Sequence, residues 1–334
     1  MNPLGISGSE IAAFERCPRL WMLRYYYGLV PADPLPTGTR ELGTNVHTAL
    51  EGLYGYSLDP LAVLQLIYGA AIESHPEHED KIKADWDLAT AMVQGYQEQV
   101  ISENWDADLR VVSTEQELRV PLPGVEGVDL RGQLDQIVME VSSGLLRFLD
   151  FKTAASFEAH TILELNRQFR TYSVLLHLHH GTVPGQPAPD GVPVVMGGII
   201  RTLRRTKRTE KAKPPFYATD PINYNPEQLD ATLRRIQWVA TQIRELRTAL
   251  DAAGGDMVTF NRIQRSMAGP VPMPSDCSWR CEASRGLCVA MDDGSDWVGM
   301  AFRSGRWKQD DPYAHYERRG IIALRQKLGT QLAG

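Results

Sequence analysis

The segment LLRFLDFKTA, residues 145–154, joins a run of large apolar residues to an aspartate and a lysine. The apolar run predicts a β-strand that packs in a protein core. Because successive side chains of a strand point to opposite faces, Asp150 and Lys152 share one face and Leu149 and Phe151 share the other. The apolar residues then build the sheet and the polar pair forms its reactive end. Taken alone, the pair would equally suit the exposed face of an edge strand.

The segment before it in the sequence offers a second carboxylate. GQLDQIVME, residues 132–140, places Asp135 among apolar residues with strand character. If these strands are neighbours, Asp135 and Asp150 meet at a sheet edge and can hold a hard divalent cation such as Mg²⁺ through oxygen ligands. Lys152 beside them could orient or deprotonate an attacking water and balance the charge of a scissile phosphate. This combination predicts phosphodiester chemistry.

The remaining pattern predicts a mixed α/β fold, with a mixed sheet flanked by helices. A capping box, Ser7 with Glu10, starts one helix, and Pro18 suits the first turn of a second. Three strands then follow one another as hairpins, before a helix, a further strand and a long helix. Helices are expected over 42–56, 85–105, 161–181 and 226–251, and strands over 109–122, 128–141, 145–153 and 192–206.

The composition is that of a soluble globular protein, with 43% hydrophobic and 23% charged residues. The formal net charge of −6 neither indicates nor excludes nucleic-acid binding, because a local basic groove can coexist with an acidic surface. No apolar run approaches the roughly 20 residues that span a bilayer. The N-terminus lacks the pattern of a signal peptide. We therefore expect no membrane association and a cytoplasmic protein with reduced thiols.

Four short motifs follow one another in elements of compatible type. They are Gly43-x3-His47, Gly132-x2-Asp135, Asp150-x-Lys152 and Gln168-x3-Tyr172. Each motif is weak alone, but their order resembles that of the PD-(D/E)XK nuclease superfamily, in its RecB-like branch. The resemblance implies a restriction-endonuclease-like core between a helical N-terminal part and a C-terminal iron–sulfur region. The expected domains are residues 1–105, 106–215 and 216–334.

The resemblance also implies the roles of the central residues. His47, Asp135, Asp150 and the backbone carbonyl of Phe151 would ligate Mg²⁺ or Mn²⁺, and Lys152 would be the catalytic lysine. Considered alone, a helical histidine such as His47 would more often be an ordinary, partly buried residue.

Two further positions complete the implied site. Gln168 and Tyr172 lie four residues apart on one helix face, which the family places over the active site, where it contacts DNA or positions the lysine. Tyr172 could instead pack in the core. The family often has an acidic residue on the strand before the Gly-x2-Asp strand, for which Glu117 is the candidate and Glu115, on the same face, the competitor.

The four cysteines form a separate group. Three follow the spacing C-x3-C-x6-C, and one lies near the N-terminus: Cys17, Cys277, Cys281 and Cys288. Disulfides are not expected in a reducing compartment, whereas four thiolates suit Zn²⁺ or an iron–sulfur cluster, and free thiols remain a third reading. One cysteine before the nuclease motifs and three after them resembles the iron–sulfur arrangement of RecB-like nucleases, including AddB-type and CRISPR-associated RecB-like exonucleases. That resemblance implies a structural 4Fe–4S cluster on all four.

A basic stretch over residues 201–215 is the candidate DNA-binding segment. Its cations could neutralise phosphates and make binding sensitive to salt: Arg201, Arg204, Arg205, Lys207 and Arg208. The alternative is a solvated hairpin loop. Aromatic residues in LWMLRYYYGL, residues 20–29, could stack on single-stranded bases, although packing in the helical layer is the simpler reading.

The sequence therefore predicts a metal-dependent DNA exonuclease that acts at DNA ends or on single strands, in phage or bacterial recombination or repair. A helicase or recombination partner is open, as is the oligomeric state. The rival hypothesis is a non-catalytic DNA-binding scaffold subunit of a helicase–nuclease complex. Intact Asp135, Asp150 and Lys152 argue against it, because a binding module does not need them.

Overall fold

In the computed structural model, the chain forms two compact units, and each is described by itself. One unit comprises Met1–Pro34, Arg119–Arg131 and Ala231–Ala314, and the other comprises Leu35–Leu118, Gly132–Asp230 and His315–Gly334. The described residues are 3–32, 36–186, 189–254, 256–271, 275, 277, 281 and 286–311. Both units are assembled from segments that are not consecutive, whereas the expected domains were consecutive ranges.

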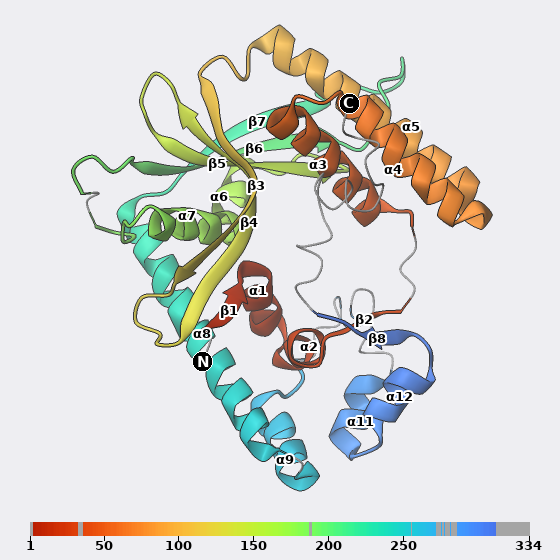
Figure 1. Cartoon of the computed structure of the whole chain (residues 1–334), viewed down its shortest axis with the longest axis vertical. Helices are drawn as coiled ribbons and strands as arrows, with labels where there is room; N and C mark the ends of the chain where they lie inside the picture. The colour runs from red at the N-terminus through yellow and green to blue at the C-terminus, as the bar shows by residue number, and fades with distance from the viewer. Residues whose placement is uncertain are drawn as a thin grey trace. The chain divides into compact units, whose positions relative to one another are not determined.

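The second unit is built on a mixed sheet (Figure 1). Strands β4 and β5 pair antiparallel, β5 and β6 parallel, and β6 and β7 antiparallel, while β3 pairs with β4. The expected mixed sheet flanked by helices is therefore confirmed. The strands are β3 (Leu109–Pro121), β4 (Val128–Glu140), β5 (Leu146–Ala154), β6 (Val195–Arg204) and β7 (Tyr217–Asn223).

Strand β5 is an interior strand of this sheet, with β4 on one side and β6 on the other. Its residues from Leu146 to Phe151 are all buried, which excludes an edge strand with an exposed Asp-x-Lys pair. On one face, Leu149 and Phe151 share a core with helices α3 (Thr39–Tyr56), α4 (Pro60–Ser74) and α5 (Glu79–Glu103), the last two joined by the turn η2 (Pro76–His78).

The opposite face of the sheet is covered by helix α7 (Arg167–His179), whose Phe169 ring stacks on Phe148 of β5 at 6.0 Å. The expected single helix over 161–181 is two helices, because α6 (His160–Leu165) ends before α7 begins. Asn166 separates them: its backbone is extended and its side-chain oxygen accepts a hydrogen bond from the Gln168 amide, so it caps α7. This cap places Gln168 in the first turn of α7.

The first unit contains the N-terminal helices and the segment with three of the cysteines. Ser7 caps α1 (Gly8–Arg16) by accepting from the Glu10 amide at 3.1 Å, as its capping box predicts. Helix α2 (Pro18–Trp21) begins at Pro18 and continues as the π-helical turn η1 (Met22–Tyr26). The Trp21 indole donates to the buried Glu10 carboxylate at 2.8 Å, which locks these helices together.

Further strands and helices complete this unit. Strand β1 pairs in parallel with residues 128–131 of β4, and β2 pairs antiparallel with β8. The elements are β1 (Leu4–Ser7), β2 (Leu29–Pro31), α8 (Pro226–Ala253, which begins in the other unit), α9 (Met257–Met267), α11 (Leu287–Asp293), α12 (Trp297–Arg303) and β8 (Trp307–Gln309). Among the described residues, no helix combines the length and apolar character needed to cross a bilayer.

A partly buried imidazole at the end of α7 couples the fold to pH. The Thr182 hydroxyl donates to the His177 carbonyl at 2.8 Å, so its oxygen must accept from Nδ1–H of the His177 ring at 2.9 Å. The Nε2 atom is then the unprotonated nitrogen, and it is buried without a hydrogen-bond partner. Burial, helped by the nearby charge of His180, lowers the pKa of His177 to about 4.

We therefore expect His177 to destabilise the fold in mild acid. Its folded pKa lies below the ordinary value of about 6.5, so protonation favours the unfolded chain, and stability falls as the pH drops from about 6.5 towards 4. After allowance for solvent screening, the loss between pH 7 and pH 5 should be about 1 kcal/mol. Urea unfolding at both pH values should show a smaller loss in His177→Gln. An equal loss would contradict this, and the exposed His160→Gln is the control.

Candidate active site

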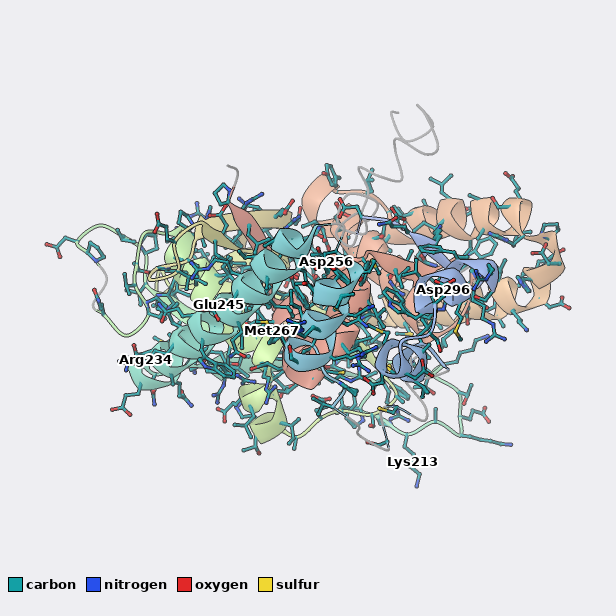
Figure 2. All side chains as sticks on the ribbon, turned by 90° about the horizontal axis from the view of Figure 1, so that it is seen from below. Lys213, Arg234, Glu245, Asp256, Met267 and Asp296 are labelled. Carbon is teal, nitrogen blue, oxygen red and sulfur yellow. The ribbon has the colours of Figure 1, made fainter. Side chains whose placement is uncertain are left out.

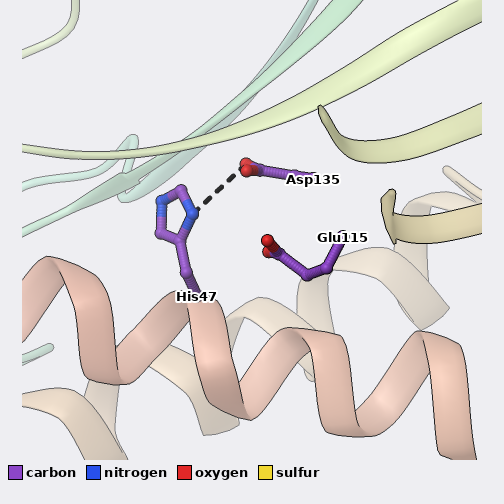
Figure 3. Close-up of side chains that lie close together, drawn as sticks. All are labelled: His47, Glu115 and Asp135. Carbon is purple, nitrogen blue, oxygen red and sulfur yellow. Dashed lines mark ion pairs between the residues drawn. The ribbon is translucent and has the colours of Figure 1, made fainter. Parts of the chain in front are cut away.

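The two predicted carboxylates and the predicted histidine converge in the second unit. His47 of α3 lies with Nδ1 3.2 Å from Oδ2 of Asp135 on β4 (Figure 3). The same oxygen accepts a hydrogen bond from the Phe151 backbone N–H of β5 at 2.7 Å. Asp150, next to Phe151, is only 2% exposed. A distant upstream helix and two consecutive strands thus bring their polar side chains to one place.

The predicted lysine is held by contacts on several sides. Its Nζ lies 2.8 Å from Asp150 Oδ2, donates to the Gln168 side-chain carbonyl at 3.2 Å, and sits 5.3 Å from the centre of the Phe169 ring. Gln168 in turn donates its amide to the Tyr172 hydroxyl at 2.7 Å. That bond directs the carbonyl oxygen of Gln168 towards Lys152, so Gln168 and Tyr172 position the lysine.

Burial and opposite charges set the protonation of these groups. Burial raises the pKa of Asp150 to about 6, because the opposing pull of Lys152 is offset by repulsion from Asp135. Burial alone would also raise the pKa of Asp135, yet His47 and then Lys152 lower it below its usual value. For both cations burial lowers the pKa, but the carboxylates outweigh it and raise the pKa of His47 and of Lys152. The protonation of each of these four groups therefore depends on the charges of the others.

Glu115 of β3 is the third acidic residue of the site. One ligand atom each from His47, Glu115 and Asp135 lie within 4.8 Å of one another, and Figure 3 shows the Glu115 carboxylate turned towards the other two side chains. Glu115 has φ +46°, a left-handed conformation that costs a non-glycine residue energy and interrupts the alternation of the strand. Glu117, the first candidate, is exposed on the same strand and lies outside this group.

The donor set fits a divalent cation. Carboxylate oxygens with one imidazole suit Mg²⁺ or Mn²⁺. Oδ2 of Asp150 is buried and, apart from the Lys152 ammonium, has no hydrogen-bond partner among the described residues. His47, Glu115, Asp135 and Asp150 are therefore the residues that could hold the ion, and the Phe151 carbonyl stays a predicted ligand. A bound ion would supply Lewis-acid stabilisation and a nucleophilic water.

The basic stretch requires one correction. Arg201 is only 1% exposed and does not face solvent, so its assignment to DNA binding is wrong. Its guanidinium lies 2.7 Å from Asp106 and donates to the hydroxyls of Tyr54 and Tyr96 and to the Trp105 carbonyl. A buried cation needs such partners, and this one ties helices α3 and α5 to β6. The other four cations of the prediction are at least partly exposed.

The cysteines belong to the first unit. Cys17 lies at the junction of α1 and α2, and Cys288 in the first turn of α11. Burial raises the pKa of Cys288 to about 11; Arg19 opposes this, and the charges of Cys281, Cys17 and Cys277 add to it. The four sulfurs are therefore close enough to interact. All four thiols are partly buried, and four cysteine sulfurs in one place are a donor set that suits a bound metal or cluster.

The buried Arg19 braces this region. Its guanidinium donates to the backbone carbonyls of Cys288 at 2.9 Å and Ala268 at 3.3 Å and to the Asp292 carboxylate at 2.7 Å. These bonds connect α2, which follows Cys17, to α11, which carries Cys288. The helices that bear two of the cysteines are thus joined by contacts of their own.

Comparisons with known proteins identify the family. A model of the PD-(D/E)XK nuclease superfamily matches residues 5–278. The chain therefore belongs to this superfamily, and it is a metal-dependent nuclease, for which DNA is the implied substrate. No curated protein matches the chain. Among solved structures, one match is titled "Crystal structure of SSO0001"; it is 13% identical, covers 71% of this chain and 75% of that chain, and has a TM-score of 0.27.

The two glutamates of β3 provide a matched test of the metal site. We expect Glu115→Gln to weaken Mn²⁺ binding by at least about tenfold, because even residues that only support metal ligands contribute that much. Glu117→Gln removes the same charge two residues away and should leave the affinity within about twofold of the native value. Isothermal titration with Mn²⁺ in the absence of DNA measures both. Equal affinities for the two variants would remove Glu115 from the site.

Proposed function

We propose that this protein is a Mg²⁺- or Mn²⁺-dependent DNA exonuclease of the RecB-like type, acting at DNA ends or on single strands. The observation that carries the proposal is the placement of His47 from the upstream helix against Asp135, because a helical histidine accompanies the sheet carboxylates in the RecB-like branch. Asp150 and Lys152 complete that motif series. The same resemblance supports a role in phage or bacterial recombination or repair, in the cytoplasm, beside a helicase or recombination partner.

Lys152 acts in this proposal as a charged hydrogen-bond donor. The neighbouring carboxylates raise its pKa, so the ammonium form dominates at neutral pH and the resting lysine has no lone pair for general-base work. From its place beside Asp150, it can orient the attacking water and stabilise the negative charge that develops on the phosphate. The Gln168 contact and the Phe169 ring limit where the ammonium can move, which lowers the cost of placing it.

Removal of either member of the Asp150–Lys152 pair should abolish most of the activity. We expect Asp150→Asn and Lys152→Met to lower kcat by about 10²–10³ on end-labelled linear DNA with Mn²⁺, since each deletes a charge aimed at the reacting phosphate. Lys83→Met, an exposed lysine paired with Glu79, is the control and should cleave normally. Linear DNA should be degraded and covalently closed circles spared.

Two results would count against the proposal. Full activity in Asp150→Asn or Lys152→Met would remove these residues from the chemistry. Wild-type protein that binds DNA but cleaves none with Mg²⁺ or Mn²⁺ would favour the non-catalytic scaffold instead.

We also propose that Cys17, Cys277, Cys281 and Cys288 hold a 4Fe–4S cluster with a structural role. Their mutual electrostatic influence on Cys288 supports a common site, and the one-plus-three spacing supports a cluster over zinc. Such a site would tie the N-terminal helices to the C-terminal segment and restrict the unfolded chain across most of its length.

Loss of one cysteine should lower iron content and stability together. We expect Cys17→Ala to lose most of its iron and its visible absorbance and to melt several degrees below the native protein, because metal-binding energy is also folding energy. Anaerobic purification, metal analysis and a thermal melt measure these. Asp150→Asn is the control and should keep its iron. Full iron retention in Cys17→Ala would contradict the cluster, and zinc in place of iron would support the alternative metal.

A further inference from the structure

The loop between β6 and β7 leaves the sheet at the same end as the catalytic lysine. Strands β5 and β6 run parallel, with Lys152 opposite Thr202 and Ala154 opposite Arg204. The Arg205 backbone N–H then donates to the Ala154 carbonyl at 2.7 Å. Arg205 thus follows the strand next to that of Lys152. It lies three residues beyond Thr202, the partner of Lys152, which is about 10 Å in the strand direction.

Arg204 closes this loop on itself. Its guanidinium donates to the backbone carbonyls of Lys213 and Pro215, at 2.9 Å and 3.1 Å, and lies 5.6 Å from the centre of the Phe216 ring. These contacts join the start of the loop to its end, so the Arg204 side chain already has hydrogen-bond partners within the protein.

Lys207 and Arg208 fasten the loop to helix α5. Lys207 pairs with Asp87 at 3.3 Å, and Arg208 pairs with Glu98 at 2.7 Å. The Arg208 side chain crosses the helix at Gly95, where a Cβ would come within 2.7 Å of its guanidinium. The glycine therefore permits a close approach of the loop to the helix, and the two ion pairs fix its position.

The remaining cations of the loop are not held by contacts of this kind. Within the part of the chain that the structure describes, the side chains of Arg205, Lys211 and Lys213 take part in no hydrogen bond or ion pair. Arg205 is partly buried, and its Nε–H is shielded from solvent without an acceptor. A desolvated donor of this kind costs free energy, so the fold gains little from the polar end of this side chain. Lys213 projects from the loop away from the ribbon (Figure 2).

We propose that Arg205 binds a backbone phosphate of the DNA next to the scissile one, with Lys211 and Lys213 as outer contacts. This inference rests on the proposed DNA nuclease function and deepens it. The planar fork of a guanidinium fits two phosphate oxygens at once, which a lysine ammonium cannot match. Because the loop is already fixed to α5, little ordering accompanies binding. The contact is to the backbone and carries no base preference.

The salt dependence of DNA binding tests this assignment. In an Asp150→Asn background that does not cleave, a fluorescein-labelled single-stranded oligonucleotide is titrated at several KCl concentrations. Arg205→Gln should weaken binding about tenfold and reduce the slope of log K against log[salt] by about 0.7, the value of one lost phosphate contact on a single strand. Arg205→Lys keeps the charge and should restore the slope. Lys83→Gln is the control for loss of an exposed cation.

Each outcome separates this inference from the proposed function. If the wild type cleaves and the parent binds DNA, yet Arg205→Gln keeps the parent slope and affinity, the phosphate contact is refuted and the nuclease stands. If the wild type neither cleaves nor binds DNA, both fall. A thermal melt of Arg205→Gln within about 2 °C of the parent shows that the loop is intact, and a change in slope then reports the contact itself.

Discussion

The site depends on one constraint, which is that buried carboxylates must be compensated. Asp150 is almost wholly buried in the interior of the sheet, and Asp135 is close enough to repel its charge. In a medium of low polarity a carboxylate either takes up a proton or acquires a cation. His47 and Lys152 supply that charge in the protein alone, and a divalent ion would supply it in the working enzyme. The apolar strand LLRFLDF thus creates the burial that makes the acidic pair favour a bound metal cation.

Phe151 links this charged site to the apolar core. Its backbone N–H donates to Asp135, and its ring packs against those of His47 and Tyr54, with ring centres 6.2 Å and 5.9 Å away. Tyr54 belongs to the same helix as His47 and receives a hydrogen bond from the buried Arg201. A buried guanidinium with strong partners is costly to displace, so it holds helix α3 in register against β5 and β6. The hydrogen bonds of Arg201 therefore help to set the position of His47 relative to Asp135.

The fold and most of the site could be predicted because their patterns are local. Apolar strand-like segments between turn signals predicted β3 to β6, the capping box predicted the start of α1, and the motif order led to His47, Asp135, Asp150 and Lys152. Helix α4 was not predicted, because it is apolar around most of its circumference and shows little helical period. The short strands β1 and β7 were missed as well. Asn166 could have marked the break between α6 and α7, since asparagine before a polar turn is a capping signal.

Glu115 and Arg201 show the limit of pattern reading. Alternation puts Glu115 and Glu117 on one face, and only a left-handed residue inside the strand separates them, which residue type does not reveal. Arg201 stands in a run of basic residues, yet the strand continues through it and turns its side chain to the buried face. Both errors arise because sequence gives the kind of residue, whereas three-dimensional neighbours decide its environment.

For the same reason, the number of basic residues in the loop after β6 says little about how tightly that loop binds DNA. Arg204, Lys207 and Arg208 already have acceptors or acids within hydrogen-bonding or ion-pair distance, and breaking those contacts would offset part of any gain from a phosphate. Only cations that the fold leaves without partners can offer their full charge to a ligand. In a chain with more acids than bases, the affinity for a polyanion therefore depends on where unpaired cations lie, not on how many bases the sequence holds.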